Sequence, residues 1–307
     1  MAKTKEISRR IKSVTSTKKI TKAMEMVAAA KMRKAIEAVL KTRAYASLSW
    51  ETIVRLAALE KSKNDAAHPL LTPRQEIKKA AVILVTSNRG MCGGYNTAIV
   101  SKAEQSLKKL GIKTDFILAG RKGGSVHQHG HNVTAEFEKS DVISDAQEVY
   151  PIVKMVLADY ISGKYDKVFI AYTDFINPVK QIPRVKQILP VEMEKVEADL
   201  GSASMNKDET GKPLDIAAEI PGGYTYEPSP SEVLDLMVPR LLEIQLFQAF
   251  LEANASEHSA RMTAMHQATE AANDMVSELT LFYNKARQAG ITAEIAEISA
   301  GANALAE

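Results

Sequence analysis

The two ends of this 307-residue chain carry apolar side chains at alternating spacings of three and four residues. In the C-terminal segment this spacing joins Met265, Ala268, Ala272, Met275, Leu279, Phe282, Ala286 and Ala289. In the N-terminal segment it joins Ile7, Ile11 and Val14, and then Ile20, Met24, Ala28, Met32, Ala35 and Val39. Such a stride over several heptads is typical of a coiled-coil seam. We therefore expect one long helix at each end of the chain.

Glycine and proline divide the chain into three parts. Neither residue occurs in the first 68 positions, all 11 prolines lie between Pro69 and Pro239, and only two glycines follow. A helix-interior Pro costs about 3 kcal/mol and a Gly about 1 kcal/mol, so the two ends are predicted to be helical. A helix over residues 3–59 would be about 85 Å long, too long for the core of its own domain. We expect it to pair antiparallel with a helix over about 240–300.

The middle of the chain alternates short apolar runs with amphipathic segments. Strands are predicted at 80–85, 114–119, 167–173 and 182–191, and helices at 97–110 and 145–161. Alternation of strands and helices predicts a mostly parallel, Rossmann-like sheet. Pro183 and Pro190 mark the last strand as an edge strand, because proline cannot donate to a central ladder.

The expected fold class is therefore α/β: a long antiparallel coiled coil of the N- and C-terminal helices with an inserted Rossmann-like α/β domain. The expected domains are an N-terminal helix at 1–68, the α/β domain at 69–230 and a C-terminal helix at 231–307. A polar stretch at about 192–220 is predicted to be an insertion or surface loop within the α/β domain.

Charge supports the pairing of the two ends. Residues 1–43 carry 13 Lys and Arg side chains against three Glu, a net charge of +10. Residues 240–307 carry four basic side chains against nine carboxylates, a net charge of −5. Opposite signs favour contact between the two arms over self-association. The alternative interpretation of the basic run is a solvated helix face.

Composition narrows the class of protein. Cys92 is the only cysteine, so we expect no intrachain disulfide and a reducing compartment. The longest apolar runs, such as 80–85, are far shorter than the roughly 18 residues of a membrane span. The charged N-terminus does not resemble a secretory signal, so we expect a protein that is neither secreted nor inserted in a membrane.

A glycine-rich turn follows the first predicted strand, at Gly90, Gly93 and Gly94. A strand, a glycine turn and a helix in this order build many phosphate sites. This turn lacks the Lys and Ser or Thr of a P-loop, because Tyr95 and Asn96 follow Gly94. It also lacks the Gly-x-Gly-x-x-Gly spacing of a dinucleotide site. We interpret the three glycines as a structural turn that needs positive φ or close backbone approach, and we expect no nucleotide cofactor.

Two further clusters are weak candidates for chemistry. The histidines within 127–131 have a metal-like composition, but no ligand set completes a site, and a polar surface loop is the favoured interpretation. Asp141, Ser144 and Asp145 suggest a hydrolase, but no nucleophile elbow or His partner can be assigned. We therefore expect no catalytic residue and no metal site.

Four segments resemble one protein family. Residues 20–33 resemble the N-terminal helix signature of the γ subunit of F-type ATP synthases, and residues 88–96 are similar to its Arg-Gly-Leu-Cys-Gly-Gly motif. Residues 257–265 and 283–294 resemble its C-terminal signatures, in the same order. The stretch 192–220 is the main departure, because it is longer than expected.

The resemblance implies a non-catalytic rotor shaft that couples ion flow through the membrane c ring to ATP synthesis or hydrolysis at the β subunits. Its implied partners are the α and β subunits of the α3β3 head, the ε subunit and the c ring, with no nucleic acid and no direct membrane insertion. Its implied place is the cytoplasmic face of a bacterial cell membrane, as a peripheral part of the synthase. Because the motifs begin near Met1, we expect no organelle transit peptide and a bacterial origin.

The resemblance also implies contact residues. It places Lys22, Met24 and Lys31 against an acidic lever of the β subunit. It places Arg287, Gln288 and Thr292 against a β loop near the top of the shaft. It places Tyr224, Tyr226 and Glu227 against the c ring.

Two other classes of function stay open from the residues alone. One is an α/β nucleotide-binding enzyme with helical arms, which the missing phosphate-site lysine disfavours. The other is a nucleic-acid binder that uses the basic helix, which the acidic C-terminal arm and the lack of a known motif disfavour.

Overall fold

The computed structural model describes residues 2–62, 69–72, 74, 76–143, 145–191, 227 and 229–306. The chain forms two compact units. The helical unit comprises Met1–Ala29 and Arg261–Glu307, and the α/β unit comprises Ala30–Ala260. These units do not decide the expected boundaries at 68 and 230, which stay a prediction. The whole of the expected insertion at 192–220 lies outside the described residues.

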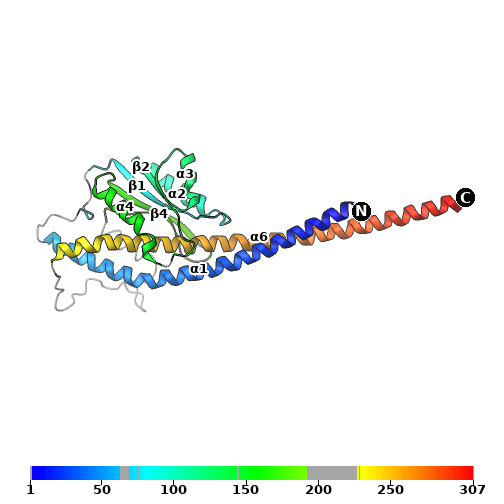
Figure 1. Ribbon diagram of the computed structural model, residues 1–307, viewed down its shortest axis with the longest axis horizontal. Helices are drawn as coiled ribbons and strands as arrows, with labels where there is room; N and C mark the ends of the chain where they lie inside the picture. Colours follow the sequence, from blue (N-terminus) through cyan, green and yellow to red (C-terminus); the bar gives the residue numbers. More distant parts are fainter. Residues whose placement is uncertain are drawn as a thin grey trace. The chain divides into compact units, whose positions relative to one another are not determined.

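Two helices, α1 (Ala2–Ser62) and α6 (Pro230–Ala306), account for the ends of the chain (Figure 1). α6 begins earlier than the expected residue 240. Ser229 caps its start: the Glu232 backbone N–H donates to Ser229 Oγ at 3.3 Å, and Ser229 Oγ donates to Glu232 Oε1 at 3.2 Å. Pro230 fits the first helical position, where a backbone N–H has no intrahelical partner.

Within the helical unit, three polar contacts define how α1 and α6 pair. Lys18 Nζ donates to Asn273 Oδ1 at 2.7 Å, and the Thr269 and Thr21 hydroxyls are 2.8 Å apart. His266 Nδ1 lies 3.3 Å from Glu25 Oε1. Residue numbers rise along one helix as they fall along the other, which confirms the expected antiparallel pairing. We call these three contacts the polar layers of the pair.

The seam of α6 has a heptad period and contains five of the eight predicted positions. Met265, Ala268, Ala272, Leu279 and Ala286 are at least partly buried, as predicted. Met275, Phe282 and Ala289 are exposed. The residues one position later, Val276, Tyr283 and Gly290, are partly buried in their place. Spacings of three and four both return to the same helix face, so an apolar pattern does not decide between them.

The seam of α1 departs from the prediction at one residue. Ile20 is 58% exposed, whereas Thr21 lies at the polar layer with Thr269. Met24 is half-buried beside the seam residue Glu25. Ile20 is predicted for the seam because it is apolar. In the structure the polar residues Thr21 and Glu25, four residues apart, contact α6 instead.

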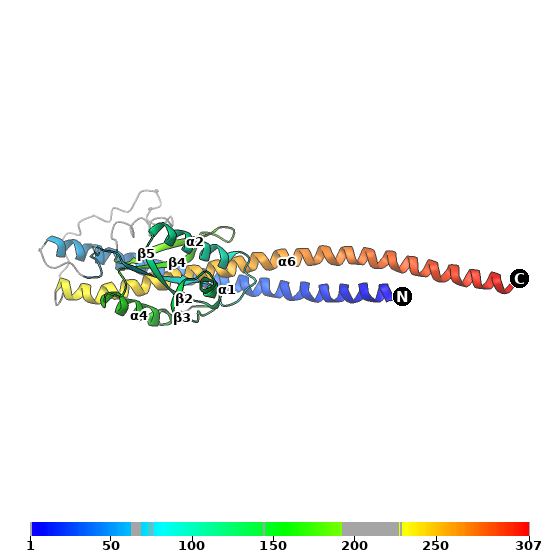
Figure 2. The same ribbon diagram turned by 90° about the horizontal axis from the view of Figure 1, so that it is seen from above.

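The α/β unit contains one five-stranded sheet in the order β3-β2-β1-β4-β5. The strands are β1 (Lys79–Val85), β2 (Lys113–Ala119), β3 (Asn132–Phe137), β4 (Lys167–Phe175) and β5 (Gln181–Leu189). The first four are parallel, and β5 pairs antiparallel with β4 at the edge (Figure 2). This confirms the mostly parallel Rossmann-like sheet and the edge position of the proline-containing strand.

Helices cover both faces of the sheet because β1 is apolar on both faces. Ala80, Val82 and Leu84 pack in one core with α2 (Tyr95–Leu110). Ala81, Ile83 and Val85 pack in a second core with α4 (Tyr150–Ile161) and with the part of α6 that belongs to the α/β unit (Figure 1). The short helices are η1 (Arg121–Gly124), α3 (Ser125–Gln128) and η2 (Ala146–Glu148). None of the described helices combines the length and the apolar character that crossing a membrane would require.

Candidate functional site

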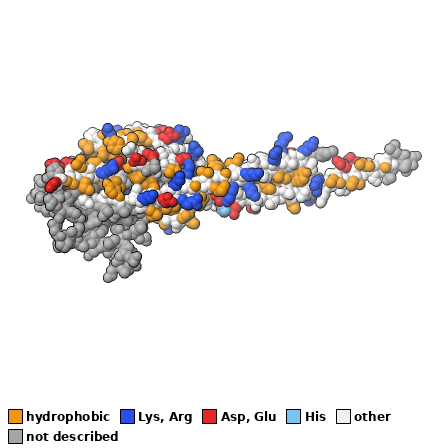
Figure 3. Space-filling model, turned by 60° about the horizontal axis from the view of Figure 1, so that its bottom comes forward, with side chains coloured by type: hydrophobic (Ala, Val, Ile, Leu, Met, Phe, Trp, Pro, Cys, Tyr) orange, Lys and Arg blue, Asp and Glu red, His pale blue; other side chains and the backbone are white. Residues whose placement is uncertain are grey.

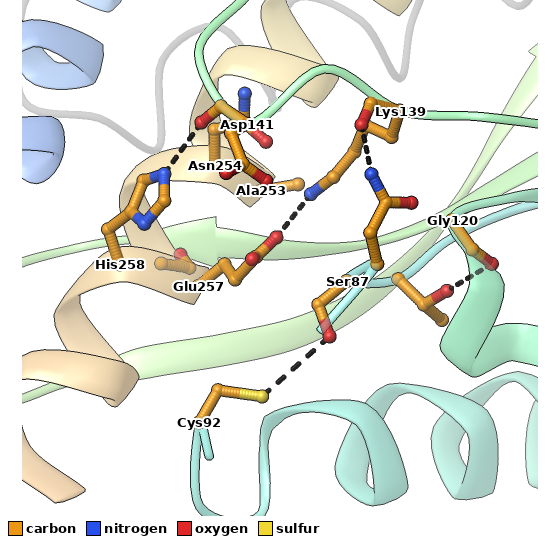
Figure 4. Close-up of polar contacts among 12 residues, drawn as sticks. Ser87, Cys92, Gly120, Lys139, Asp141, Ala253, Asn254, Glu257 and His258 are labelled. Atoms are coloured by element: carbon orange, nitrogen blue, oxygen red, sulfur yellow. Dashed lines mark hydrogen bonds and ion pairs between the residues drawn. The ribbon is translucent and has the colours of Figure 1, made fainter. Parts of the chain in front are cut away.

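The glycine turn between β1 and α2 is closed by side chains of its own segment. The Ser87 backbone N–H donates to Asn96 Oδ1 at 3.0 Å, and Asn96 Nδ2 donates to Ser87 Oγ at 2.8 Å. Cys92 is buried, with its Sγ 3.8 Å from Ser87 Oγ (Figure 4). The side chains of Ser87 and Asn96 therefore bond to each other within the segment.

The three glycines of this turn differ in what they require. Gly93 has φ of +56°, a conformation in which a Cβ is disfavoured. Gly94 has an ordinary φ of −82°. A Cβ on Gly90 would meet no described atom within 4 Å. The structural requirement expected for all three therefore applies to Gly93, while Met91 also takes a positive φ of 63°.

The glycine that directly follows β2, Gly120, has the stronger steric requirement. Gly120 has φ of +104°, and a Cβ there would lie 2.3 Å from the Thr86 carbonyl oxygen. Thr86 Oγ1 also donates to the Gly120 carbonyl at 3.0 Å. This glycine lets the loops after β1 and β2 approach closely, and the sequence signal for it was a Gly directly after an apolar strand.

The carboxyl edge of the sheet between β1 and β4 is the position at which open α/β sheets bind ligands, because the strand order reverses there. In this chain α6 lies across that edge. The Tyr95 hydroxyl donates to the Ala253 carbonyl at 3.2 Å, and Ser256 Oγ donates to the Thr173 carbonyl at 3.0 Å. Ala253 and Ser256 are fully buried. The crevice is therefore occupied by the protein's own helix.

A buried ion pair lies at the same edge. Lys139 Nζ is 2.6 Å from Glu257 Oε2, and their side chains are 1% and 3% exposed (Figure 4). Asn88 Nδ2 donates to the Lys139 carbonyl. Neither charged residue was a candidate from the sequence. Their positions are 118 residues apart, so no local pattern could connect them.

Asp141, a candidate hydrolase residue in the sequence analysis, bonds to both long helices instead. Its carboxylate lies 2.8 Å from Lys31 Nζ of α1, and its carbonyl accepts from His258 Nε2 of α6 at 2.7 Å. The hydrogen bond from Lys31 lowers the pKa of Asp141, against a smaller opposing effect of burial. Asp145 caps η2 by accepting from the Gln147 backbone N–H. Ser144 lies outside the described residues.

The histidine segment makes pairs and no metal cluster. His129 Nδ1 lies 2.5 Å from Glu104 Oε1, and His127 Nε2 lies 3.1 Å from Glu136 Oε1. Across the described part of the chain, His, Cys, Asp and Glu form no group of three that could hold a metal ion.

The residues expected to contact the β subunit lie mainly on exposed helix surface. Lys22 is exposed and lies 3.0 Å from Glu25, whereas Met24 is half-buried. Arg287, Gln288 and Thr292 are all exposed. Lys31 differs, because its ammonium is paired with Asp141 of the same chain. Of the residues expected to contact the c ring, Glu227 is exposed, and Tyr224 and Tyr226 lie outside the described residues.

The helical unit also exposes large apolar side chains, three of which the sequence analysis had predicted for the seam. On α1, Ile20, Met26 and Val27 are each more than half exposed. On α6, the exposed set is Met275, Leu281, Phe282, Ile291, Ile295 and Ile298. Apolar side chains and Lys and Arg side chains both appear on this unit's surface (Figure 3). Apolar side chains gathered on a thin helical pair are typical of a surface that other proteins cover.

Comparison with known proteins identifies relatives over the full length of the chain. A family model described as ATP synthase matches residues 3–305. A protein named ATP synthase gamma chain from Herpetosiphon aurantiacus is 40% identical over 314 residues, with 99% of each chain covered. One of the same name from Coxiella burnetii is 39% identical over 310 residues, with 99% of this chain and all of the relative covered.

Solved structures share the fold. A chain from the Euglena gracilis mitochondrial ATP synthase, in a structure of OSCP, F1 and c-ring, aligns with a TM-score of 0.63 at 17% identity, covering 99% of this chain and 95% of that one. A chain from the central stalk and c-ring of the Tetrahymena thermophila mitochondrial ATP synthase aligns with a TM-score of 0.59 at 20% identity, covering 81% and 99%.

Proposed function

The chain belongs to the family of ATP synthase gamma chains, the central-stalk subunits of that complex, and we propose that it works as the rotor shaft between the c ring and the catalytic head. The observation that carries the proposal is the antiparallel pair of helices with exposed apolar side chains such as Ile20, Met26 and Val27. Exposed apolar patches of this kind are typical of surfaces that contact other proteins.

The proposed mechanism is mechanical. A pair of unlike helices presents different faces to the three β subunits as it turns. Each face favours one conformation of the neighbouring catalytic site, so rotation changes the binding free energy of nucleotide at each site in turn. Ion flow through the c ring drives the rotation during synthesis, and ATP hydrolysis drives it in reverse.

The proposed shaft has no active site of its own. The support for this is the crevice between β1 and β4, which α6 fills with Ala253, Ser256 and Glu257. A nucleotide at the usual position of such a sheet would have to displace a buried helix. Catalysis is therefore assigned to the β subunits of the complex.

The partners proposed for the chain are the α and β subunits, the ε subunit and the c ring. Lys22 and Met24 are proposed to contact an acidic segment of β, as are Arg287, Gln288 and Thr292 higher on the shaft. Support comes from the exposure of four of these five residues. Lys31 is a weaker candidate, because a β carboxylate would compete with Asp141 for its ammonium. Tyr224, Tyr226 and Glu227 are proposed to contact the c ring.

The proposed location is the cytoplasmic face of a bacterial cell membrane, as a peripheral part of the synthase. The bacterial origin of relatives such as those from Herpetosiphon aurantiacus and Coxiella burnetii supports this.

Affinity capture with the full chain tests the function. We expect the tagged chain to retain α and β subunits of its own synthase, and the isolated chain to hydrolyse no ATP. The same preparation is assayed for salt-dependent DNA binding. ATP turnover by the isolated chain would favour a nucleotide-binding enzyme, tight DNA binding would favour a nucleic-acid binder, and failure to retain α and β would exclude the shaft.

A further inference from the structure

Three consecutive residues after β3 each bond to a long helix. Lys139 pairs with Glu257 of α6, the Ser140 carbonyl accepts from Asn254 Nδ2 of α6 at 3.4 Å, and Asp141 pairs with Lys31 of α1. We call residues 139–141 the joint segment. Figure 4 shows Lys139 and Asp141 directed toward Asn254, Glu257 and His258.

The joint segment meets both helices at one place along their lengths. On α1 the α/β unit begins at Ala30, next to Lys31. On α6 it ends at Ala260, one helical turn after Glu257 and His258. These contacts therefore lie where both helices leave the α/β unit.

The chemistry of these contacts differs from that of the surrounding core. The hydrophobic stabilisation of the sheet–α6 core is non-directional and depends on how much apolar area is buried. A buried ion pair is directional, and separating its members leaves two uncompensated charges in a medium of low dielectric constant. Such a pair resists displacement of α6 along the sheet edge.

Stability alone is a poor explanation for a buried ion pair. Well-packed apolar residues of similar volume often stabilise a fold as well or better. The Lys139–Glu257 pair also fixes the position of α6 against the segment that follows β3. That property matters for a part that transmits force.

We propose that the joint segment is the force-transmitting connection that holds α1 and α6 against the α/β domain while the shaft turns. Lys139 and Glu257 are positioning residues in this connection, and the Lys31–Asp141 pair extends it to the second helix. This inference rests on the proposed rotor function. It predicts that the connection is dispensable for unloaded turnover and necessary under load.

The test uses the complete synthase in vesicles, with ATP hydrolysis and ion pumping measured as the opposing ion gradient is raised. Glu257→Gln leaves the Lys139 charge without its carboxylate. We expect near-normal hydrolysis and normal ions pumped per ATP at low gradient, and a several-fold loss of ions pumped per ATP at high gradient. Lys164→Met is the matched control, because it breaks an exposed ion pair with Asp159 at a similar 2.7 Å in the same unit.

A second and a third variant keep the proposal testable if Glu257→Gln prevents assembly. The double variant Lys139→Met with Glu257→Leu removes both buried charges, so the fold has no orphan charge. Asp141→Asn removes the charge of the partly exposed pair to Lys31, keeps the backbone carbonyl that accepts from His258, and leaves the core intact. We expect both to assemble and to lose coupling at high gradient, with the smaller loss for Asp141→Asn.

A merely structural role would reduce the amount of assembled synthase and leave the ions pumped per ATP unchanged at every gradient. Variants that assemble and pump like wild type against the highest gradient would overturn the proposal. Failure of the rotor function itself gives a different result, because the unaltered chain would then neither retain α and β nor support pumping.

Discussion

Lys79 Nζ lies 2.6 Å from Asp115 Oδ2, and this contact joins the first residues of β1 to the neighbouring strand β2. Asn132 Nδ2 and the Tyr165 hydroxyl also donate to the same carboxylate, at 2.9 Å and 3.0 Å. The Asp115 side chain is 4% exposed, so its charge depends on these three donors. The amino edge of the sheet is therefore organised around one buried carboxylate.

The first prediction concerns this carboxylate. Lys79→Met should lower the free energy of unfolding by about 2 kcal/mol, because a hydrogen bond to a charged group is lost while the Asp115 charge stays buried. Urea unfolding of the isolated chain measures the change. Lys113→Met is the control, since Lys113 pairs with Lys79 in the β1–β2 register but is exposed. Equal stability of the two variants would contradict the prediction.

The second prediction is the pH dependence of the same site. Burial raises the pKa of Asp115, but the hydrogen bonds from Lys79, Asn132 and Tyr165 outweigh it and lower the pKa below 3.8. A carboxylate with a lowered folded-state pKa stabilises the fold above its unfolded-state pKa, and this stabilisation is lost as pH falls through the lower, folded-state value. Urea midpoints measured from neutral pH to about pH 3 should fall more steeply for the wild-type chain than for Asp115→Asn.

The third prediction separates two glycines. Gly120→Ala should cost about 3 kcal/mol, because the new Cβ would lie 2.3 Å from the Thr86 carbonyl oxygen at a φ of +104°. Gly90→Ala should be nearly neutral, since a Cβ there meets no described atom within 4 Å. Thermal unfolding of the two variants is the measurement. A Gly120→Ala chain as stable as wild type would show that the two loops separate without cost.

The fourth prediction concerns coupling and rests on the proposed contact between Met24 and an acidic segment of β. Met24 is half-buried on α1, next to Glu25, and the long stem of a lysine there can reach an acid outside the seam. A new ion pair of about 1–3 kcal/mol would have to break and reform as the shaft turns. We expect Met24→Lys synthase to assemble, to hydrolyse ATP and to pump ions poorly.

Met24→Leu is the matched control, because it keeps the apolar volume without the charge. If Met24 serves only to pack the helix pair, Met24→Lys should instead assemble poorly. Normal assembly with normal pumping per ATP would exclude the proposed contact.

Local pattern was sufficient for the elements whose apolar residues are continuous. The run at β1 and the long stretches without Gly or Pro predicted the buried strand and both long helices. β3 was missed because its residues, Asn132–Phe137, alternate between exposed and partly buried positions and contain no apolar run. Hydrogen-bonded pairing with β2 stabilises this strand, although its own residues are not strongly apolar.

The buried ion pair at the carboxyl edge of the sheet could not be predicted from the sequence, for a different reason. Its members come from the β1 turn, the segment after β3, and α6, and each looks ordinary within its own stretch of sequence. Glu257 falls in a helix that also carries exposed carboxylates, such as Glu270 and Glu278. Only the packing of α6 over the sheet distinguishes the buried carboxylate from the exposed ones. Charged residues that act through tertiary burial leave no periodic signal.

The polar layers of the helical unit have a consequence for the register of its two helices. Apolar heptads repeat, so a slip of one heptad would leave much of the apolar seam matched to itself. It would not preserve the polar partners: in one direction Lys18 would approach His266 and Thr21 would approach Met262, and in the other Thr21 would approach Val276. Three different pairs in succession therefore specify a single alignment of the two helices, and a displacement by one heptad would break all three.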